Sequence, residues 1–206
     1  LWYHLSIKKS MFKIHFSEQE LIDLLYAWAA ITFAFAILLS GRSFFHFSEN
    51  LLISGLTVGL AFLVHEISHK IVAQRYNCWA EFRKFDLGLI LAVISSFFGF
   101  AFVMPGAVLI FGFVSEKENG KISASGPLSN IFLALIFLIC YIICRRFFSF
   151  PLIIVKIFAN GVSINSWLAF FNLLPFPPMD GSKIIRWSPQ IWGILILISG
   201  LMVFLF

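Results

Sequence analysis

Residues 62–76 read FLVHEISHKIVAQRY, and they place two histidines and a glutamate inside a stretch that otherwise suits a lipid environment. Ionisable side chains are costly inside a bilayer and usually have a function where they occur there. The interpretation of these three groups depends on whether the stretch lies in a membrane, which the composition and the apolar runs of the rest of the chain indicate.

The composition indicates an integral membrane protein. The chain has 206 residues, of which 60% are hydrophobic and 12% are charged. A soluble domain has about 45–50% apolar and about 25% charged residues. Several runs approach or exceed the roughly 18–20 apolar residues that a helix needs to cross a hydrocarbon core of about 30 Å. The net charge is +5, and the basic residues lie in short loops beside these runs. Basic residues at such positions set the orientation of membrane helices, so they do not indicate a nucleic-acid partner.

The apolar runs predict the membrane-spanning helices. Ser17 precedes the first run, with Glu20 three residues later, which is the pattern of a capping box at a helix start. A polar turn is expected over residues 116–121. The predicted spans cover residues 21–39, 51–76, 127–144, 152–174 and 191–206.

The uncharged region 87–115 decides the topology. It is too long for one span, whereas two spans with a turn need about 40 residues. Gly99, Pro105, Gly106 and Gly112 suit a segment that dips into the membrane and returns. With a return, most basic residues share one side, which the positive-inside rule favours as cytosolic. These residues are Lys8, Lys9, Lys13, Arg75, Arg83, Lys84, Lys117, Lys121, Lys183 and Arg186, and only Arg42, Arg145 and Arg146 lie opposite.

The chain is therefore expected to be an all-α polytopic membrane protein. We expect about five to six transmembrane helices and a re-entrant segment that could contain a small β-hairpin. Residues 1–16 would form a cytosolic N-terminal segment, and residues 17–206 one membrane domain of a multi-pass protein of the cell membrane. Residues 1–10 precede Met11, and we interpret them as a remnant of an expression vector.

His65-Glu66-Ile67-Ser68-His69 has the form H-E-x-x-H. On a helix, His65 and His69 point the same way and can both reach one ion. Glu66 lies beside them and is free to act as a general base, as in metalloproteases. The alternative is that these are polar residues satisfied between packed helices, which is less expected within a membrane.

A third ligand is needed, because catalytic zinc takes three protein ligands and keeps one position open. The sequence has three aspartates, Asp23, Asp86 and Asp180. Asp180 follows a proline-rich stretch over residues 172–179, NLLPFPPM, and precedes Gly181. Such a rigid loop can present a carboxylate as a metal ligand, and a plain solvated loop aspartate is the alternative. Two imidazoles and one carboxylate suit zinc.

HEISH on a membrane helix, followed by NLLPFPPMDG about a hundred residues later, resembles the site-2 proteases, which are intramembrane zinc metalloproteases. SGP at residues 125–127 resembles the G-P element that this family has between the two motifs. The resemblance implies that His65, His69 and Asp180 hold Zn²⁺. It makes residues 17–206 an intramembrane metalloprotease domain.

The resemblance also implies a reaction and a substrate class. Glu66 would activate a zinc-bound water, and Asn172 would orient the substrate backbone or steady the oxyanion. The substrates would be transmembrane proteins, cleaved near the cytosolic face of the lipid bilayer in regulated intramembrane proteolysis. Residues 104–112, followed by 121–125, could form a membrane-dipping hairpin that binds an unwound substrate by strand addition, with simple packing as the alternative.

Two rival functions remain open. The chain could be a non-catalytic membrane protein that binds a divalent metal, either a transporter or an inactive protease homologue. Transporters usually show repeated halves and several intramembrane acids, and this sequence has no visible repeat. The intact HEISH motif and Asp180 favour an active enzyme over an inactive relative.

Overall fold

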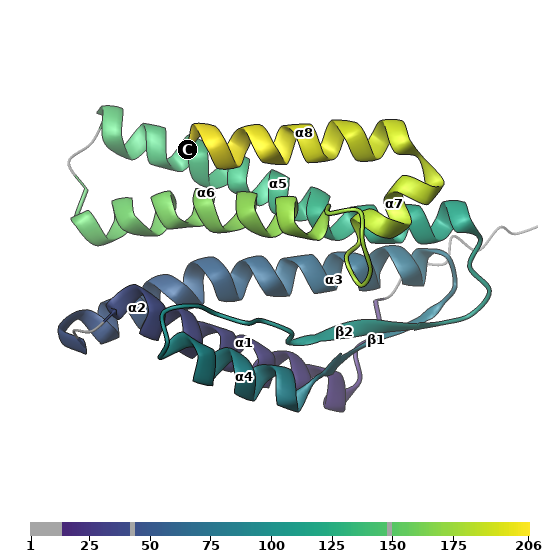
Figure 1. The fold of residues 1–206 in the computed structure, drawn as a ribbon, viewed down its shortest axis with the longest axis horizontal. Helices are drawn as coiled ribbons and strands as arrows, with labels where there is room; N and C mark the ends of the chain where they lie inside the picture. The colour runs from purple at the N-terminus through teal and green to yellow at the C-terminus, as the bar shows by residue number, and fades with distance from the viewer. Residues whose placement is uncertain (1–13, 42–43, 148–149) are drawn as a thin grey trace, which may run out of the picture.

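The structure is a computed structural model that describes residues 14–41, 44–147 and 150–206 (Figure 1). The interpretation of residues 1–10 and most of the expected cytosolic segment lie outside the described residues. Four of the charges used to predict the topology, Lys8, Lys9, Lys13 and Arg42, lie outside them as well.

Among the described residues, four helical segments are long and apolar enough to cross a membrane. Three of them are single helices: α1 (Glu18–Ser40), α5 (Glu116–Phe147) and α6 (Leu152–Asn172). The other is one continuous segment made of α2 (Phe47–Ser54), a π-helical stretch (Gly55–Gly59) and α3 (Leu60–Arg75). The same ranges contain two shorter apolar helices, α4 (Asp86–Ser96) and α8 (Pro189–Leu205), as well as a short 3-10 turn (Phe44–His46) and the short helix α7 (Gly181–Trp187). The predicted fold class, an all-α polytopic membrane protein, is confirmed.

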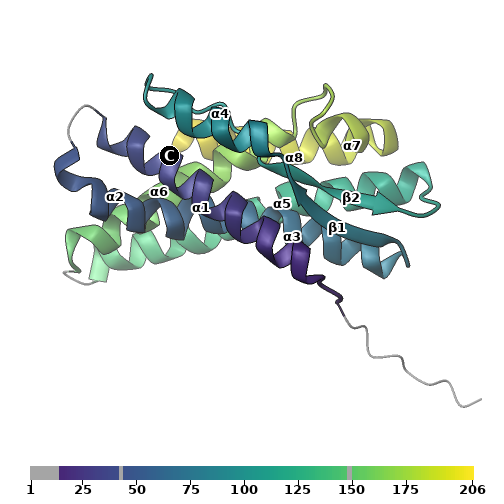
Figure 2. The same cartoon turned by 90° about the horizontal axis from the view of Figure 1, so that it is seen from below.

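Helix α3, which carries the HEISH motif, lies in the middle of the molecule (Figure 1). α5, α6 and α8 cover one side of it, and α1, α4 and a two-stranded sheet lie on the other (Figure 1). In the view turned by 90°, the two strands lie side by side and α4 is at one margin of the molecule (Figure 2). The motif helix is therefore enclosed between two groups of elements that come from distant parts of the sequence.

The region after α3 leaves its starting point and returns to it. β1 (Trp79–Lys84) pairs antiparallel with β2 (Gly106–Phe111), and Lys84 lies opposite Gly106. The Phe85 N–H donates a hydrogen bond of 2.9 Å to the Pro105 carbonyl and closes the base of the excursion. α4 lies within it and has 11 residues, or about 16 Å of helix. This length is too short to cross the bilayer, so the predicted return is present.

The partners in the hairpin differ from those that the sequence suggested. Residues 106–111 form a strand, but residues 121–125 lie in α5, and the second strand is β1. The expected polar turn at 116–121 is also helical. Ser115 explains this, because its hydroxyl accepts from the Glu118 N–H at 3.3 Å and its own N–H donates to the Glu118 carboxylate at 2.9 Å. These two bonds form a capping box that starts α5 early.

The start of α1 is capped as the sequence predicted, but Glu20 has a different role. Ser17 Oγ accepts from the Glu20 N–H at 3.2 Å. The fully buried Glu20 side chain does not return to Ser17; it accepts from the Phe82 N–H at 2.9 Å and from Lys70 Nζ at 2.6 Å. Lys70 is buried too and donates to the Ala80 carbonyl at 2.7 Å. These bonds join α1, β1 and α3.

Candidate metal centre

Helix α3 positions the two histidines of the HEISH motif. Their four-residue spacing places both imidazoles on one face, and their Nε2 atoms lie 3.0 Å apart. Both side chains are buried, with 4% of His65 and 8% of His69 exposed. Two ring nitrogens this close, buried together, are typical of a pair that shares one ion.

The loop between α6 and α7 brings Asp180 to this pair. The loop descends from α6 towards α3 (Figure 1). It is held at its start by the Leu173 carbonyl, which accepts from Trp192 Nε1 at 2.7 Å. Gly181 makes the close fold possible, because a Cβ atom there would lie 2.1 Å from that same carbonyl oxygen. Asp180 Oδ2 lies 3.3 Å from His65 Nε2 and 3.1 Å from His69 Nε2.

The three donor atoms fit a zinc ion. Zinc bound tetrahedrally at about 2.0–2.1 Å places neighbouring ligand atoms about 3.3 Å apart. Here the three separations are 3.0, 3.1 and 3.3 Å. Among the described residues, His65, His69 and Asp180 form a group whose possible ligand atoms all lie within 4.8 Å of one another. The two imidazoles and the carboxylate are a donor set that suits zinc, and catalytic zinc sites generally combine three protein ligands with a fourth position for a reactant.

Gly126 on α5 leaves the space that the imidazoles occupy. A Cβ atom at this position would lie 2.4 Å from His69 Nε2 and 2.7 Å from His65 Cε1. Any side chain would therefore displace both rings. The sequence singled out this glycine only as part of the G-P element, and its contact with the rings depends on how α5 packs against α3.

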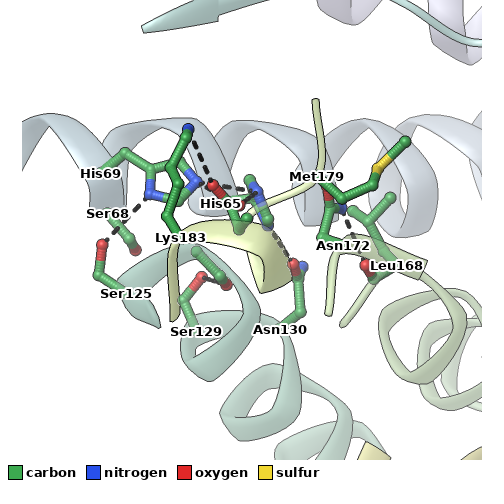
Figure 3. A network of polar contacts seen from close by, with 12 residues as sticks. His65, Ser68, His69, Ser125, Ser129, Asn130, Leu168, Asn172, Met179 and Lys183 are labelled. Atoms are coloured by element: carbon green, nitrogen blue, oxygen red, sulfur yellow. Dashed lines mark hydrogen bonds and ion pairs between the residues drawn. The ribbon is translucent and has the colours of Figure 1, made fainter. Parts of the chain in front are cut away.

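Hydrogen bonds on the far side of each ring fix how the imidazoles are turned. His69 Nδ1 lies 2.8 Å from the Ile122 carbonyl, and His65 Nδ1 lies 2.6 Å from Asn130 Oδ1. Figure 3 shows Asn130 directed at His65 and Ser125 near His69. The sequence analysis missed Asn130. A polar residue inside an apolar span was the signal that could have pointed to it.

The surroundings of Asp180 keep its carboxyl group ionised. Burial by itself would raise the pKa of Asp180, but the electrostatic attraction of the neighbouring His69 outweighs burial and lowers the pKa well below its usual range. Lys183 Nζ lies 3.7 Å from the other carboxylate oxygen, Oδ1. In Figure 3 the Lys183 side chain extends alongside the two imidazoles. An anionic ligand is therefore available to balance the charge of a divalent cation.

Glu66 and Asn172, the two predicted catalytic residues, lie in different surroundings. Glu66 is half-buried and lies close enough to interact electrostatically with both histidines and with Asp180. Asn172 is the last residue of α6, and its side-chain amide donates to the Leu168 carbonyl at 2.9 Å, as Figure 3 shows. Glu66 thus stands beside the metal ligands, whereas the role of Asn172 stays a prediction.

Comparison with known proteins found two relatives. A protein of Methanocaldococcus jannaschii with the name "Putative zinc metalloprotease MJ0611" is 42% identical over 183 residues, which cover 87% of this chain and 90% of the relative. A Bacillus subtilis protein, "Putative zinc metalloprotease YwhC", is 27% identical over 148 residues, which cover 64% of this chain and 66% of the relative.

No family model matches the chain. No solved structure matches it either. The first relative shares 42% identity with this chain over most of both proteins, which is enough to place the two in one protein family. Its name agrees with a buried His-His-Asp cluster that fits zinc. The chain therefore belongs to the zinc metalloprotease family of these relatives, and zinc is its cofactor.

Proposed function

We propose that this metalloprotease works inside the membrane, as the site-2 proteases do, and hydrolyses peptide bonds of transmembrane proteins. The observation that carries the proposal is the place of the metal ligands. His65 and His69 are buried on a segment that is long and apolar enough to span a bilayer. A zinc site built on such a segment is suited to substrates that are themselves embedded in lipid.

The depth of the site supports an active centre near the cytosolic face. His69 lies six residues before Arg75, where α3 ends, which corresponds to about 9 Å along the helix. Basic residues are concentrated on the loops and helix ends at this side. Those among the described residues are Arg75, Arg83, Lys84, Lys117, Lys121, Lys183 and Arg186. At the opposite side lie Arg145 and Arg146, at the other end of α5, and Lys156, near the start of α6. The positive-inside rule assigns the richer side to the cytosol.

In the proposed reaction, water adds to the carbonyl carbon of the scissile bond and the carbon–nitrogen bond breaks. Held by His65, His69 and Asp180, zinc would supply the Lewis acidity that polarises a carbonyl and lowers the pKa of water to about 7. Glu66 accepts the proton of the attacking water and returns it to the leaving amine. Asn172 is proposed to orient the substrate backbone or to steady the oxyanion.

β2 is the proposed docking edge for the substrate. A substrate helix must unwind before hydrolysis, because its amides are bonded within the helix. Among residues 14–41, 44–147 and 150–206 the sheet has two strands, so one edge of β2 has no strand partner. An extended substrate segment can pair with such an edge through its main chain. The re-entrant segment would thus hold the substrate in the form that the zinc site cleaves.

Replacing the proposed base tests this function. The protein is purified in lipid nanodiscs and given a transmembrane peptide, with zinc measured in the same samples. Glu66→Gln is expected to lower the cleavage rate about 10²- to 10⁴-fold, since general base catalysis contributes that much. It should still bind zinc, because Glu66 is not a ligand.

Glu18→Gln is the matched control, because Glu18 is exposed in the first turn of α1. It should cleave at the wild-type rate. Normal turnover by Glu66→Gln would remove Glu66 as the base. A wild-type protein that binds zinc but cleaves no peptide would favour the rival function, a non-catalytic metal-binding membrane protein.

A further inference from the structure

Two asparagines lie fully buried between the motif helix and its neighbours. Asn130 is on α5 and Asn165 on α6, and neither side chain has exposed surface. Neither belongs to the HEISH motif or to the loop that carries Asp180. Buried amides are kept only where their hydrogen bonds are satisfied, so the partners of this pair indicate its purpose.

The directions of the hydrogen bonds are fixed by two backbone carbonyls. Asn165 Nδ2 donates to the Gly161 carbonyl at 2.8 Å, which leaves Asn165 Oδ1 as an acceptor. Asn130 Nδ2 donates to that oxygen at 3.1 Å and to the Ala61 carbonyl, also at 3.1 Å. Because a carbonyl can only accept, neither amide can be turned over. Asn130 therefore presents its Oδ1 to His65.

This arrangement determines which nitrogen of His65 carries the hydrogen. Asn130 Oδ1 lies 2.6 Å from His65 Nδ1 and can only accept, so the hydrogen is on Nδ1. The Nε2 atom of the neutral ring then has a free lone pair, on the side where His69 and Asp180 lie.

We propose that Asn130, locked by Asn165, is a positioning residue that holds His65 in the Nδ1–H tautomer and aims its Nε2 lone pair at zinc. A neutral amide does this without adding another charge to a membrane-embedded site, where a carboxylate would be expensive. His69 receives the same support from the Ile122 backbone carbonyl. Asn130 is thus the partner that a substitution can remove. The inference rests on the metal site of the proposed function.

The test compares Asn130→Leu with the wild type in nanodiscs. Zinc affinity is measured by competition with a chromogenic chelator, and the His65 tautomer by ¹⁵N NMR of the zinc-free protein labelled in its imidazoles. Loss of a partner of this kind typically weakens metal binding about 10- to 100-fold, and we expect that loss here. The ¹⁵N shifts of His65 should change from the Nδ1–H form to a mixture of tautomers.

Asn160→Leu is the matched control. Asn160 lies on α6, like Asn165, and its side chain donates to the Lys156 carbonyl one turn back. It should keep wild-type zinc affinity and His65 shifts. An Asn130→Leu protein with affinity within twofold of wild type and an unchanged tautomer would overturn the proposal. Equal losses in both leucine variants would also overturn it, because general destabilisation would then explain them.

If Asn130→Leu does not fold, Asn165→Leu replaces it. This variant keeps the contact between Asn130 and His65 but releases the amide that fixes it, so weaker zinc binding and mixed tautomers are expected again. Wild-type values in Asn165→Leu would contradict the lock. Failure of the proposed protease activity is a separate result, because neither readout here requires cleavage of a substrate.

Discussion

At the scale of single residues, the metal centre depends on Gly126 of α5, which has no Cβ atom. The absence of a Cβ at Gly126 lets α5 approach the two imidazoles, and this close approach also brings Ile122 and Asn130 to their Nδ1 atoms. Two histidines on one helix therefore do not make the site alone. The site also needs a neighbouring helix that has no side chain where the rings lie and that offers a hydrogen-bond acceptor to each Nδ1 atom.

Gly126→Ala tests this requirement. The new methyl group would lie 2.4 Å from His69 Nε2, so the rings must move and zinc affinity should fall more than about tenfold, as it does when the support of metal ligands is lost. The measurement is chelator competition on the purified variant.

Gly193→Ala is the control for Gly126→Ala. A Cβ at Gly193 in α8 would meet no atom within 4 Å. This variant should bind zinc normally and gain up to about 1 kcal/mol of helix stability. Wild-type zinc affinity in Gly126→Ala would show that the rings do not need the space.

The sequence predicts the ligands more readily than their supports. His65 and His69 are visible because their spacing is close to one helical turn, and Asp180 because prolines stiffen the loop before it. Asn130 lies in an apolar span with no local pattern around it, and Gly126 is marked only as part of the G-P element, which does not indicate a contact with the imidazoles. Their roles exist only once α5 lies against α3, and no local property of the sequence encodes that contact.

At the scale of elements, β1 is held in place by side chains from two helices. Glu20 of α1 accepts from the Phe82 N–H, and Lys70 of α3 donates to the Ala80 carbonyl. The sequence of β1 is short and mixed in polarity, so no local pattern predicts a strand there. The strand depends on these bonds to distant helices, which the local sequence does not reveal. Residues 106–111 were easier, since glycines at both ends and apolar residues between them mark a separate extended segment.

Glu20→Gln should loosen this junction. The substitution leaves the buried Lys70 ammonium without its charged partner, which costs about 3–5 kcal/mol for buried pairs. The free energy of unfolding in detergent measures the loss. Glu18→Gln, two residues earlier and exposed on the same helix, should change little. Equal stability of both variants would mean that the pair does not hold β1 to α1 and α3.

At the scale of the whole molecule, the re-entrant segment decides where the two halves of the site meet. The antiparallel register of β1 and β2 returns the chain to the side from which it left. α5 then begins at that side and runs for 32 residues, or about 48 Å, which is long enough to reach both faces of the bilayer. Charge and length sufficed to predict this path, whereas the lengths of α4 and α5 were not predictable from them.

Cysteine labelling in intact cells tests the orientation. In a background without Cys78, Cys140 and Cys144, single cysteines replace Lys121 and Arg146, which are exposed near opposite ends of α5. A membrane-impermeant maleimide should label Arg146→Cys in intact cells, and Lys121→Cys only after permeabilisation. Labelling of Lys121→Cys in intact cells would place the zinc site at the outer face.

The zinc K-edge X-ray absorption spectrum of the purified protein tests the central claim, that His65, His69 and Asp180 converge on one ion. We expect one zinc per chain, with nitrogen and oxygen neighbours at about 2.0–2.2 Å and the outer scattering of two imidazoles. In Asp180→Asn the zinc content should fall. A zinc-free protein, sulfur neighbours at about 2.3 Å, or an unchanged spectrum and zinc content in Asp180→Asn would contradict the account.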